Sequence, residues 1–142
     1  MAEVIYKPLH AAISVSNLEA AISWFEENMG FQFKMKSDIV PAGFRVAFLD
    51  NHGGFEVELF ENVNQKPANP ERFHPDTDQK TLGNKHVAFE VADLDERLAF
   101  LKTKGIEPVM GPTVCFGMYV AFIHGPDKCL LELIQWDHSD RS

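Results

Sequence analysis

Two stretches of the chain share the same order of apolar and polar positions. Each opens on an alternating segment, 8–15 and then 84–91, which predicts a β-strand because successive side chains of a strand point to opposite faces. Apolar residues at helical spacing come next, followed by a glycine where a helix end is favoured, at Gly30 and Gly105. Each stretch therefore predicts a βαβββ unit. The later strands are expected at 31–36, 43–50 and 54–61, and again at 107–110, 116–124 and 129–136.

The two predicted helices have matching start signals. Asn17 and Asp93 are favourable N-cap residues, and Glu96 stands three residues after Asp93, the spacing of a capping box. Each helix is expected to pack one apolar stripe against its own strands. The stripes consist of Leu18, Ala21, Ile22 and Phe25 in the first helix, and of Leu94, Leu98 and Leu101 in the second.

Residue identities repeat along with the pattern. Residues 9–18 align with a segment 76 positions later, and residues 43–49 and Glu58 align with segments 74 positions later. Three blocks in the same order indicate a duplicated unit. We expect one α+β domain over 1–142, made of two repeats at about 8–61 and 84–136. The linker, 62–83, is long enough to predict a lid or a spacer.

Composition excludes several classes of function. Thirteen basic and twenty-one acidic residues give the 142-residue chain a net charge of −8, which disfavours binding to nucleic acids and to anionic membranes. No apolar run reaches the length of a membrane span, and the first residues lack the pattern of a secretory signal. Cys115 and Cys129 are expected to be reduced thiols, so we expect a cytoplasmic protein.

Four polar residues occupy matched positions in the two repeats. His10 and His86 alternate with apolar residues in the first strand of each unit, and Glu58 and Glu132 do so in the last strand. Alternation therefore places all four on the strand side opposite the apolar residues that pack on the helix. Small residues next to the histidines leave room for a ligand.

A pseudo-twofold arrangement of the repeats would bring these four side chains together. Two neighbouring carboxylates repel each other unless a cation or a proton lies between them, and a divalent metal resolves that conflict. Imidazole and carboxylate ligands suit Zn, Ni, Co, Mn or Fe. We therefore predict a metal site of His10, Glu58, His86 and Glu132, with one or two positions left for a substrate. The alternative is a structural role for each histidine and a solvent-facing position for each glutamate.

Other polar residues are weaker candidates. The remaining histidines are expected in turns, in the linker or in the tail: His52, His74, His124 and His138. Three further side chains are candidates for substrate contact, with ordinary surface positions as the alternative: Arg45, Arg72 and Tyr119.

The four segments that carry these residues resemble the vicinal oxygen chelate superfamily, which includes glyoxalase I, methylmalonyl-CoA epimerase, extradiol dioxygenases and drug-resistance proteins. The segments are LHAAISVSNLEAAISWFEENMGF, FEVELFE, KHVAFEVADLDE and LLELIQ. The resemblance, over residues 8–136, implies an eight-stranded open cup around a metal, often completed in a homodimer. By position, the four predicted ligands match the metal ligands of glyoxalase I.

Resemblance to glyoxalase I also implies a function. It suggests a lyase or isomerase in which a metal-bound glutamate, Glu132 first and Glu58 as its counterpart, moves a proton next to a chelated carbonyl of a small substrate with neighbouring oxygens. Ser14 stands where glutathione-using relatives have an arginine, whereas Asn62 matches a glutathione-contacting position.

Three other functions remain open. They are an Fe(II) extradiol-type dioxygenase with His10, His86 and Glu132 as its triad, an epimerase acting on methylmalonyl-CoA, and a non-enzymatic drug-binding protein.

Overall fold

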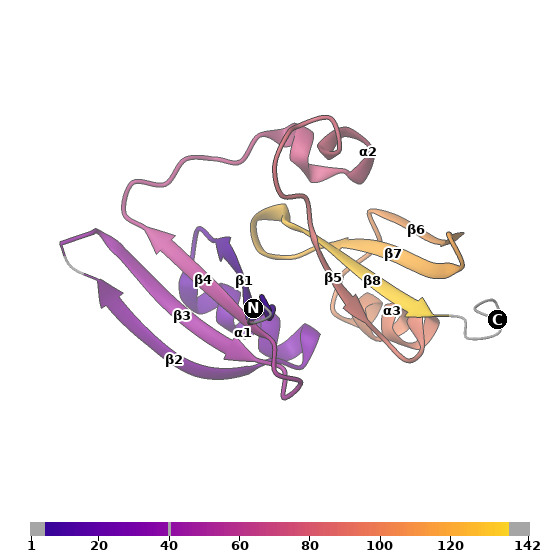
Figure 1. The fold of residues 1–142 in the computed structure, drawn as a ribbon, viewed down its shortest axis with the longest axis horizontal. Coiled ribbons are helices and arrows are strands. Elements are labelled where there is room, and N and C mark those ends of the chain that lie inside the picture. Colours follow the sequence, from indigo (N-terminus) through magenta and orange to yellow (C-terminus); the bar gives the residue numbers. More distant parts are fainter. Residues whose placement is uncertain (1–4, 40, 137–142) are drawn as a thin grey trace, which may run out of the picture. The chain divides into compact units, whose positions relative to one another are not determined.

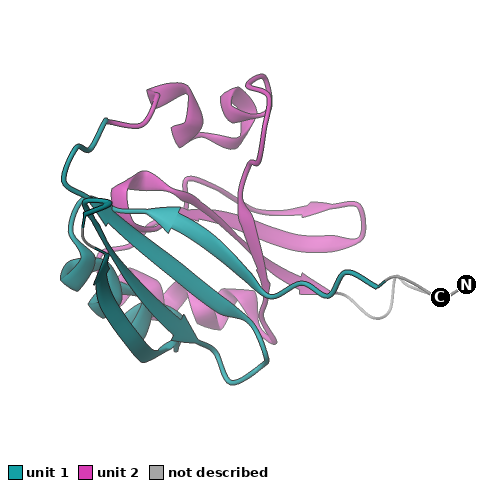
Figure 2. Cartoon of the chain, turned by 60° about the vertical axis from the view of Figure 1, so that its left-hand side comes forward, with its two compact units in different colours: residues 1–66 teal, residues 67–142 magenta. Residues whose placement is uncertain are grey.

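The computed structural model of the chain describes residues 5–39 and 41–136. These residues belong to two compact units, 1–66 and 67–142, each built on one four-stranded sheet (Figure 1; Figure 2). The predicted duplication of a βαβββ unit is therefore seen directly. Within the described residues, no helix has the length and apolar character needed to cross a membrane.

The sheet of unit 1 has the strand order β1-β4-β3-β2. Strands β1 and β4 are parallel, and the other neighbours are antiparallel. A parallel pair requires a crossover connection, and helix α1 is part of it. The elements are β1 (His10–Ser14), α1 (Leu18–Met29), β2 (Gln32–Ile39), β3 (Phe44–Asp50) and β4 (Glu56–Asn62).

The sheet of unit 2 repeats this topology in the order β5-β8-β7-β6, again with its first and last strands parallel. Two short helical segments precede it. The elements are η1 (Pro70–Phe73), α2 (Pro75–Asp78), β5 (Val87–Glu90), α3 (Leu94–Thr103), β6 (Met110–Cys115), β7 (Met118–His124), η2 (Pro126–Lys128) and β8 (Leu130–Trp136).

Both long helices begin in the same way. The side chains of Asn17 and Asp93 each accept a hydrogen bond of 3.0 Å from the backbone amide three residues later, as the sequence predicted. A second acceptor comes from the last strand of each sheet: Glu61 and Gln135 bind the amide of the first helical residue, at 2.6 and 2.8 Å. The polar ends of the helices are thus satisfied by groups that also fix each helix to its sheet.

The core of each unit lies between its helix and its sheet. In unit 1 the predicted stripe of α1 is buried against β3 and β4. In unit 2 only two of the three predicted apolar residues of α3 are fully buried, because Leu98 remains half-exposed. The fully buried strand residues are Ala47, Leu49, Val57 and Leu59 in unit 1, and Ala121, Ile123, Leu131 and Leu133 in unit 2.

Most strand ends lie within three residues of the prediction, and two larger differences concern one strand and the linker. The strand expected at 107–110 instead runs from Met110 to Cys115 and includes Pro112. It is an edge strand with an irregular register between Met110 and Thr113, where a proline removes no necessary ladder hydrogen bond. The predicted linker also carries structure, since residues 70–78, here called the cap segment, form η1 and α2.

Buried polar contacts hold the cap segment. The carboxylate of Asp78, which is 1% exposed, lies 2.9 Å from Arg72 Nε and 3.5 Å from Lys85 Nζ. Arg72 also donates to the carbonyl of Asn84, so one guanidinium joins the cap segment to the residues just before β5. The part of the linker that precedes β5 is therefore a folded component of unit 2.

Candidate functional site: two histidine–glutamate pairs

The two faces of the unit 1 sheet differ in what covers them. Arg45 of β3 donates to Glu19 of α1 at 2.9 Å, so the face that carries Arg45 is the helix side. Alternation places Phe48 on the other face, together with its cross-strand partner Glu58 and with Ala12 on β1. We call the side of each sheet that is turned away from its own helix the site face.

His10 and Glu58 meet on the site face of unit 1. The distance from His10 Nε2 to Glu58 Oε2 is 2.9 Å, and the side chains are 32% and 16% exposed. The ring of Phe48 contacts the imidazole edge-on, with the ring centroids 6.0 Å apart. A hydrogen-bonding contact and an aromatic wall therefore fix the orientation of the imidazole, which remains accessible.

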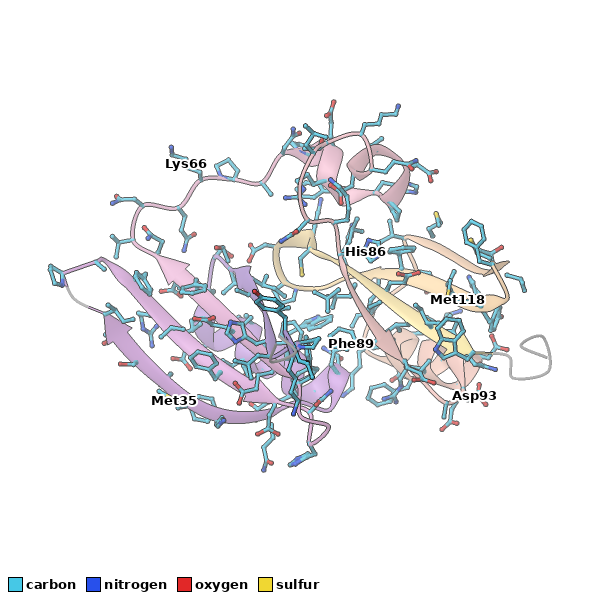
Figure 3. The ribbon with its side chains drawn as sticks, viewed as in Figure 1. Met35, Lys66, His86, Phe89, Asp93 and Met118 are labelled. Atoms are coloured by element: carbon cyan, nitrogen blue, oxygen red, sulfur yellow. The ribbon has the colours of Figure 1, made fainter. Side chains whose placement is uncertain are left out.

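His86 and Glu132 form the same arrangement in unit 2. Their Nε2 and Oε2 atoms are 2.8 Å apart, with side-chain exposures of 31% and 13%. Phe122 packs edge-on against the imidazole at 4.9 Å, and Figure 3 shows His86 where the chain enters β5. The structure thus brings each histidine to the glutamate of its own unit, while the set of four ligands stays a prediction.

The chemistry of these donors fits a divalent metal. Imidazole nitrogen and carboxylate oxygen are donors that Zn and related divalent metals bind, and each pair holds one of each within 2.9 Å. Each pair supplies one imidazole nitrogen and one carboxylate. Among the described residues, no group of three or more metal-ligating side chains is already assembled. Each unit therefore offers two side chains of the kinds that bind divalent metals.

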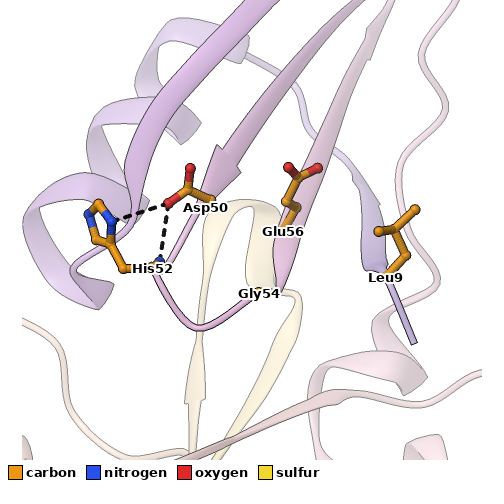
Figure 4. Close-up of a pocket in the computed structure, with 5 residues that line it drawn as sticks. All are labelled: Leu9, Asp50, His52, Gly54 and Glu56. Atoms are coloured by element: carbon orange, nitrogen blue, oxygen red, sulfur yellow. Dashed lines mark hydrogen bonds and ion pairs between the residues drawn. The ribbon is translucent and has the colours of Figure 1, made fainter. Parts of the chain in front are cut away.

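An acidic hollow lies beside the pair in unit 1. It has a volume of about 350 Å³ and is lined by Leu9, Asp50, His52, Gly54 and Glu56, but not by the histidine–glutamate pair (Figure 4). Asp50 accepts a hydrogen bond from the backbone amide of His52. The Glu56 carboxylate binds Lys34 at 2.5 Å, and this hydrogen bond raises the pKa of the Lys34 ammonium. Of the two carboxylates that line the hollow, that of Glu56 is therefore already neutralised by a lysine.

The arginine and tyrosine candidates for substrate contact lie elsewhere. Arg45 binds α1, and Tyr119 donates a hydrogen bond of 2.7 Å to Asp95 of α3, so both belong to the helix sides of their sheets. That hydrogen bond also raises the pKa of Tyr119. Arg72 is committed to the cap segment. Ser14, in contrast, shares the site face with His10.

His124 has a role that the sequence analysis did not assign. It lies two residues beyond Phe122 on β7 and therefore on the same face as Glu132. Its Nε2 lies 2.6 Å from the backbone carbonyl of Phe73, whose ring packs edge-on against the imidazole at 6.4 Å. His124 thus joins the cap segment to the site face, and strand alternation was the signal that would have found it.

The other histidines occupy local positions, as expected. His52 lies in the turn after β3, and His74 caps α2 by accepting from the amide of Asp76 at 3.2 Å. His138 lies outside the described residues.

Comparison with known proteins identifies the family. A family model described as the Glyoxalase/Bleomycin resistance protein/Dioxygenase superfamily matches residues 9–122, which include both histidines and Glu58. The chain belongs to this superfamily. Members of the superfamily differ in activity. Membership therefore establishes the fold, whereas the reaction has to be inferred from the residues of the site.

Individual relatives cover nearly the whole chain. A lactoylglutathione lyase of Neisseria meningitidis is 29% identical over 138 residues, with 94% of each chain aligned. A Bacillus subtilis protein named YwkD is 30% identical over 89% of this chain and 94% of its own. The crystal structure of a glyoxalase family protein from Enterococcus faecalis superposes with a TM-score of 0.76, at 28% identity over 90% of this chain and 96% of that one. The superfamily fold expected from the sequence is therefore shown.

Proposed function

We propose that the protein is a divalent-metal-dependent lyase or isomerase of the glyoxalase I type. The observation that carries the proposal is the repetition of one histidine–glutamate pair, with nitrogen–oxygen distances of 2.9 and 2.8 Å, at equivalent places in two units. A structural role would explain one such pair, whereas two copies on site faces favour a shared ligand. The lactoylglutathione lyase among the relatives supports the same class of reaction.

The proposed site consists of His10, Glu58, His86 and Glu132. Bound there, Zn, Ni, Co, Mn or Fe would polarise a carbonyl of a small substrate with two neighbouring oxygens. The two imidazoles and the two carboxylates would together hold the ion, and the two carboxylates would balance its double positive charge. Neither unit alone provides this set, so both pairs are needed.

The proton is moved by a carboxylate of the chain. We assign this role to Glu132, with Glu58 as its counterpart. The carboxylate takes the proton from the carbon next to the carbonyl, so that a C–H bond breaks and an O–H bond forms. It then returns the proton to the adjacent carbon. The Glu132 side chain is 13% exposed, so its carboxyl proton remains within reach of solvent deuterium.

Metal content and hydrogen exchange test the proposal together. The purified protein should hold about one metal ion per set of four ligands, and His10→Ala or His86→Ala should each remove most of it. Incubation of α-hydroxycarbonyl compounds with the loaded protein in D₂O should exchange the proton next to the carbonyl without consuming oxygen. Iron with oxygen uptake would favour a dioxygenase instead, and full metal retention in both variants would refute the ligand set.

Mixing variants shows whether two copies of the chain share a site. We propose a homodimer in which each site takes one pair from each copy. A mixture of inactive His10→Ala and His86→Ala chains should then regain about a quarter of the activity, because a mixed dimer contains one intact set. If each site belonged to one chain, the mixture would stay inactive.

A further inference from the structure

The edge strand β5 carries a second carboxylate close to the pair in unit 2. Ala88 pairs with Glu132 and Glu90 pairs with Ile134, so Ala88 and Glu90 both lie on the site face. Both residues are exposed. Glu90 therefore lies on the same open strip of sheet as the proposed catalytic carboxylate, with only the methyl group of Ala88 between its row and that of His86.

The cap segment covers the opposite end of this strip. His124 contacts the carbonyl of Phe73 at 2.6 Å, and Lys128 Nζ lies 5.1 Å from the centre of the Phe73 ring. The site face beyond His86 is thus occupied by the chain itself. Along β5, in contrast, Ala88 and Glu90 of this face are exposed within the unit.

No basic side chain in the described part of unit 2 binds the carboxylate of Glu90. Strands β5, β6, β7 and β8 contain no lysine or arginine. The nearby basic residues are engaged elsewhere: Arg72 and Lys85 bind Asp78, and Lys128 lies over Phe73. The backbone of Glu90 belongs to the β5–β8 ladder, but within the described part of the chain its carboxylate has no hydrogen bond or ion pair. Its carboxylate is therefore available to interact electrostatically with a ligand that lies along β5.

The equivalent position in unit 1 is uncharged. Ser14 lies four residues after His10, as Glu90 lies four residues after His86, and it shares the site face with Phe60. The two halves of the proposed site therefore differ in charge at matched positions.

We propose that Glu90 is a specificity-determining residue that favours substrates with a cationic tail and disfavours those with a carboxylate or phosphate tail. The inference rests on the proposed function, since it needs a ligand held by its chelating oxygens at the pairs. Glu90 acts through charge alone and takes no part in proton transfer. Its effect must therefore decrease with added salt.

Three hydroxamates of equal length test the inference by binding, without the need for turnover. Each offers two neighbouring oxygens to the metal, and their tails end in an amine, a hydroxyl or a carboxylate. Isothermal titration into Ni²⁺-loaded protein gives a Kd for each. Glu90→Gln removes the charge at nearly constant size, and Glu107→Gln is a matched control because Glu107 is also exposed in unit 2 but lies before β6.

Glu90→Gln should tighten binding of the carboxylate probe by about 3- to 10-fold and weaken binding of the amine probe by a similar factor, with the hydroxyl probe unchanged. Both effects should shrink in 1 M NaCl, and Glu107→Gln should show neither. Unchanged ratios among the three probes, or equal shifts in the control, would overturn the role of Glu90 and leave the proposed function intact. Failure of all three probes to bind the wild-type metal-loaded protein would overturn the proposed function, and this inference with it.

Discussion

The two units share a topology and a side-chain pair but differ in how they are stabilised and covered. Unit 1 packs its helix through four buried apolar residues, whereas α3 of unit 2 buries two. Unit 2 instead has the cap segment with the buried carboxylate of Asp78. The edge strand β2 of unit 1 exposes Phe33, Met35 and Ile39. The nitrogen–oxygen distance within the pair agrees to within 0.1 Å despite these differences.

This contrast separates two kinds of constraint. The positions of histidine and glutamate depend on strand pairing, which is the same in both units, and only weakly on the packing of the helix. Packing and covering segments are free to change while the pair stays in place. A comparison of variants at matched positions can therefore show which differences between the units matter for activity and which for stability.

The largest expected difference concerns the two glutamates. Glu132→Gln should lower kcat by about 10²–10⁴-fold, the usual contribution of a general base, while weakening metal binding only modestly. Glu58→Gln should mainly weaken metal binding. Steady-state kinetics at saturating metal, together with metal titration, separates the two effects. Equal losses of kcat at saturating metal would show that the two carboxylates are equivalent.

The next difference concerns helix packing. Phe25 of α1 is fully buried, so Phe25→Ala should lower the free energy of unfolding by about 3–5 kcal/mol. Phe100 of α3 is half-exposed and lies beneath Arg97, 4.4 Å from the guanidinium carbon, so Phe100→Ala should cost only about 1 kcal/mol. Urea denaturation followed by circular dichroism measures both. A larger loss from Phe100→Ala would mean that α3 depends on contacts other than its buried leucines.

A smaller effect, equal in both units, is expected at the helix starts. Asn17→Ala and Asp93→Ala each remove one side-chain acceptor from a helix amide, and each should cost about 1 kcal/mol. Thermal unfolding of the two variants gives the comparison. Serine at either position should restore most of the loss, which would identify the capping hydrogen bond as the cause.

The smallest effect involves the two free cysteines, both in unit 2. Burial raises the pKa of the Cys129 thiol from its ordinary value of 9.0 to about 12. Iodoacetamide at pH 8 should therefore label the exposed Cys115 and leave Cys129 unmodified, because the thiolate is the reactive form. Mass spectrometry reads the outcome, and both thiols should react in urea.

The raised pKa of the Cys129 thiol also makes the free energy of unfolding depend on pH. Between pH 9 and about 12 the unfolded thiol of Cys129 ionises while the folded one does not. The free energy of unfolding should therefore fall as the pH rises through this range, and Cys129→Ala should reduce that dependence. An unchanged dependence in the variant would assign it to other groups.

Much of the fold followed from the sequence because the repeat supplied each element twice. A strand or cap that is weak in one copy was supported by its counterpart, as Asp93 supports Asn17. The expected boundary of the strand at 107–110 was wrong because Pro112 reads as a break, although an edge strand tolerates it. The cap segment was missed because its stability depends on Arg72, Asp78 and Lys85, which only folding brings together.

The candidate site was predictable to the level of each pair. Alternation placed His10, Glu58, His86 and Glu132 on the site faces, and the structure brings each histidine to its own glutamate. The four-ligand set remains a prediction. His124 and Glu90 also lie on the site face by alternation, but the sequence analysis assigned neither a role, because the cap segment that borders this face was not predicted.

The parallel pairing of the first and last strands has a consequence for how the protein forms. His10 lies opposite Glu56, so β1 has no partner until the ribosome has made nearly the whole of unit 1. Local contacts of α1 with β2 and β3 can form earlier, whereas this long-range closure comes late and slows folding. The contact of His10 with Glu58 therefore forms only once β4 is present, so a nascent chain that ends before β4 lacks this pair.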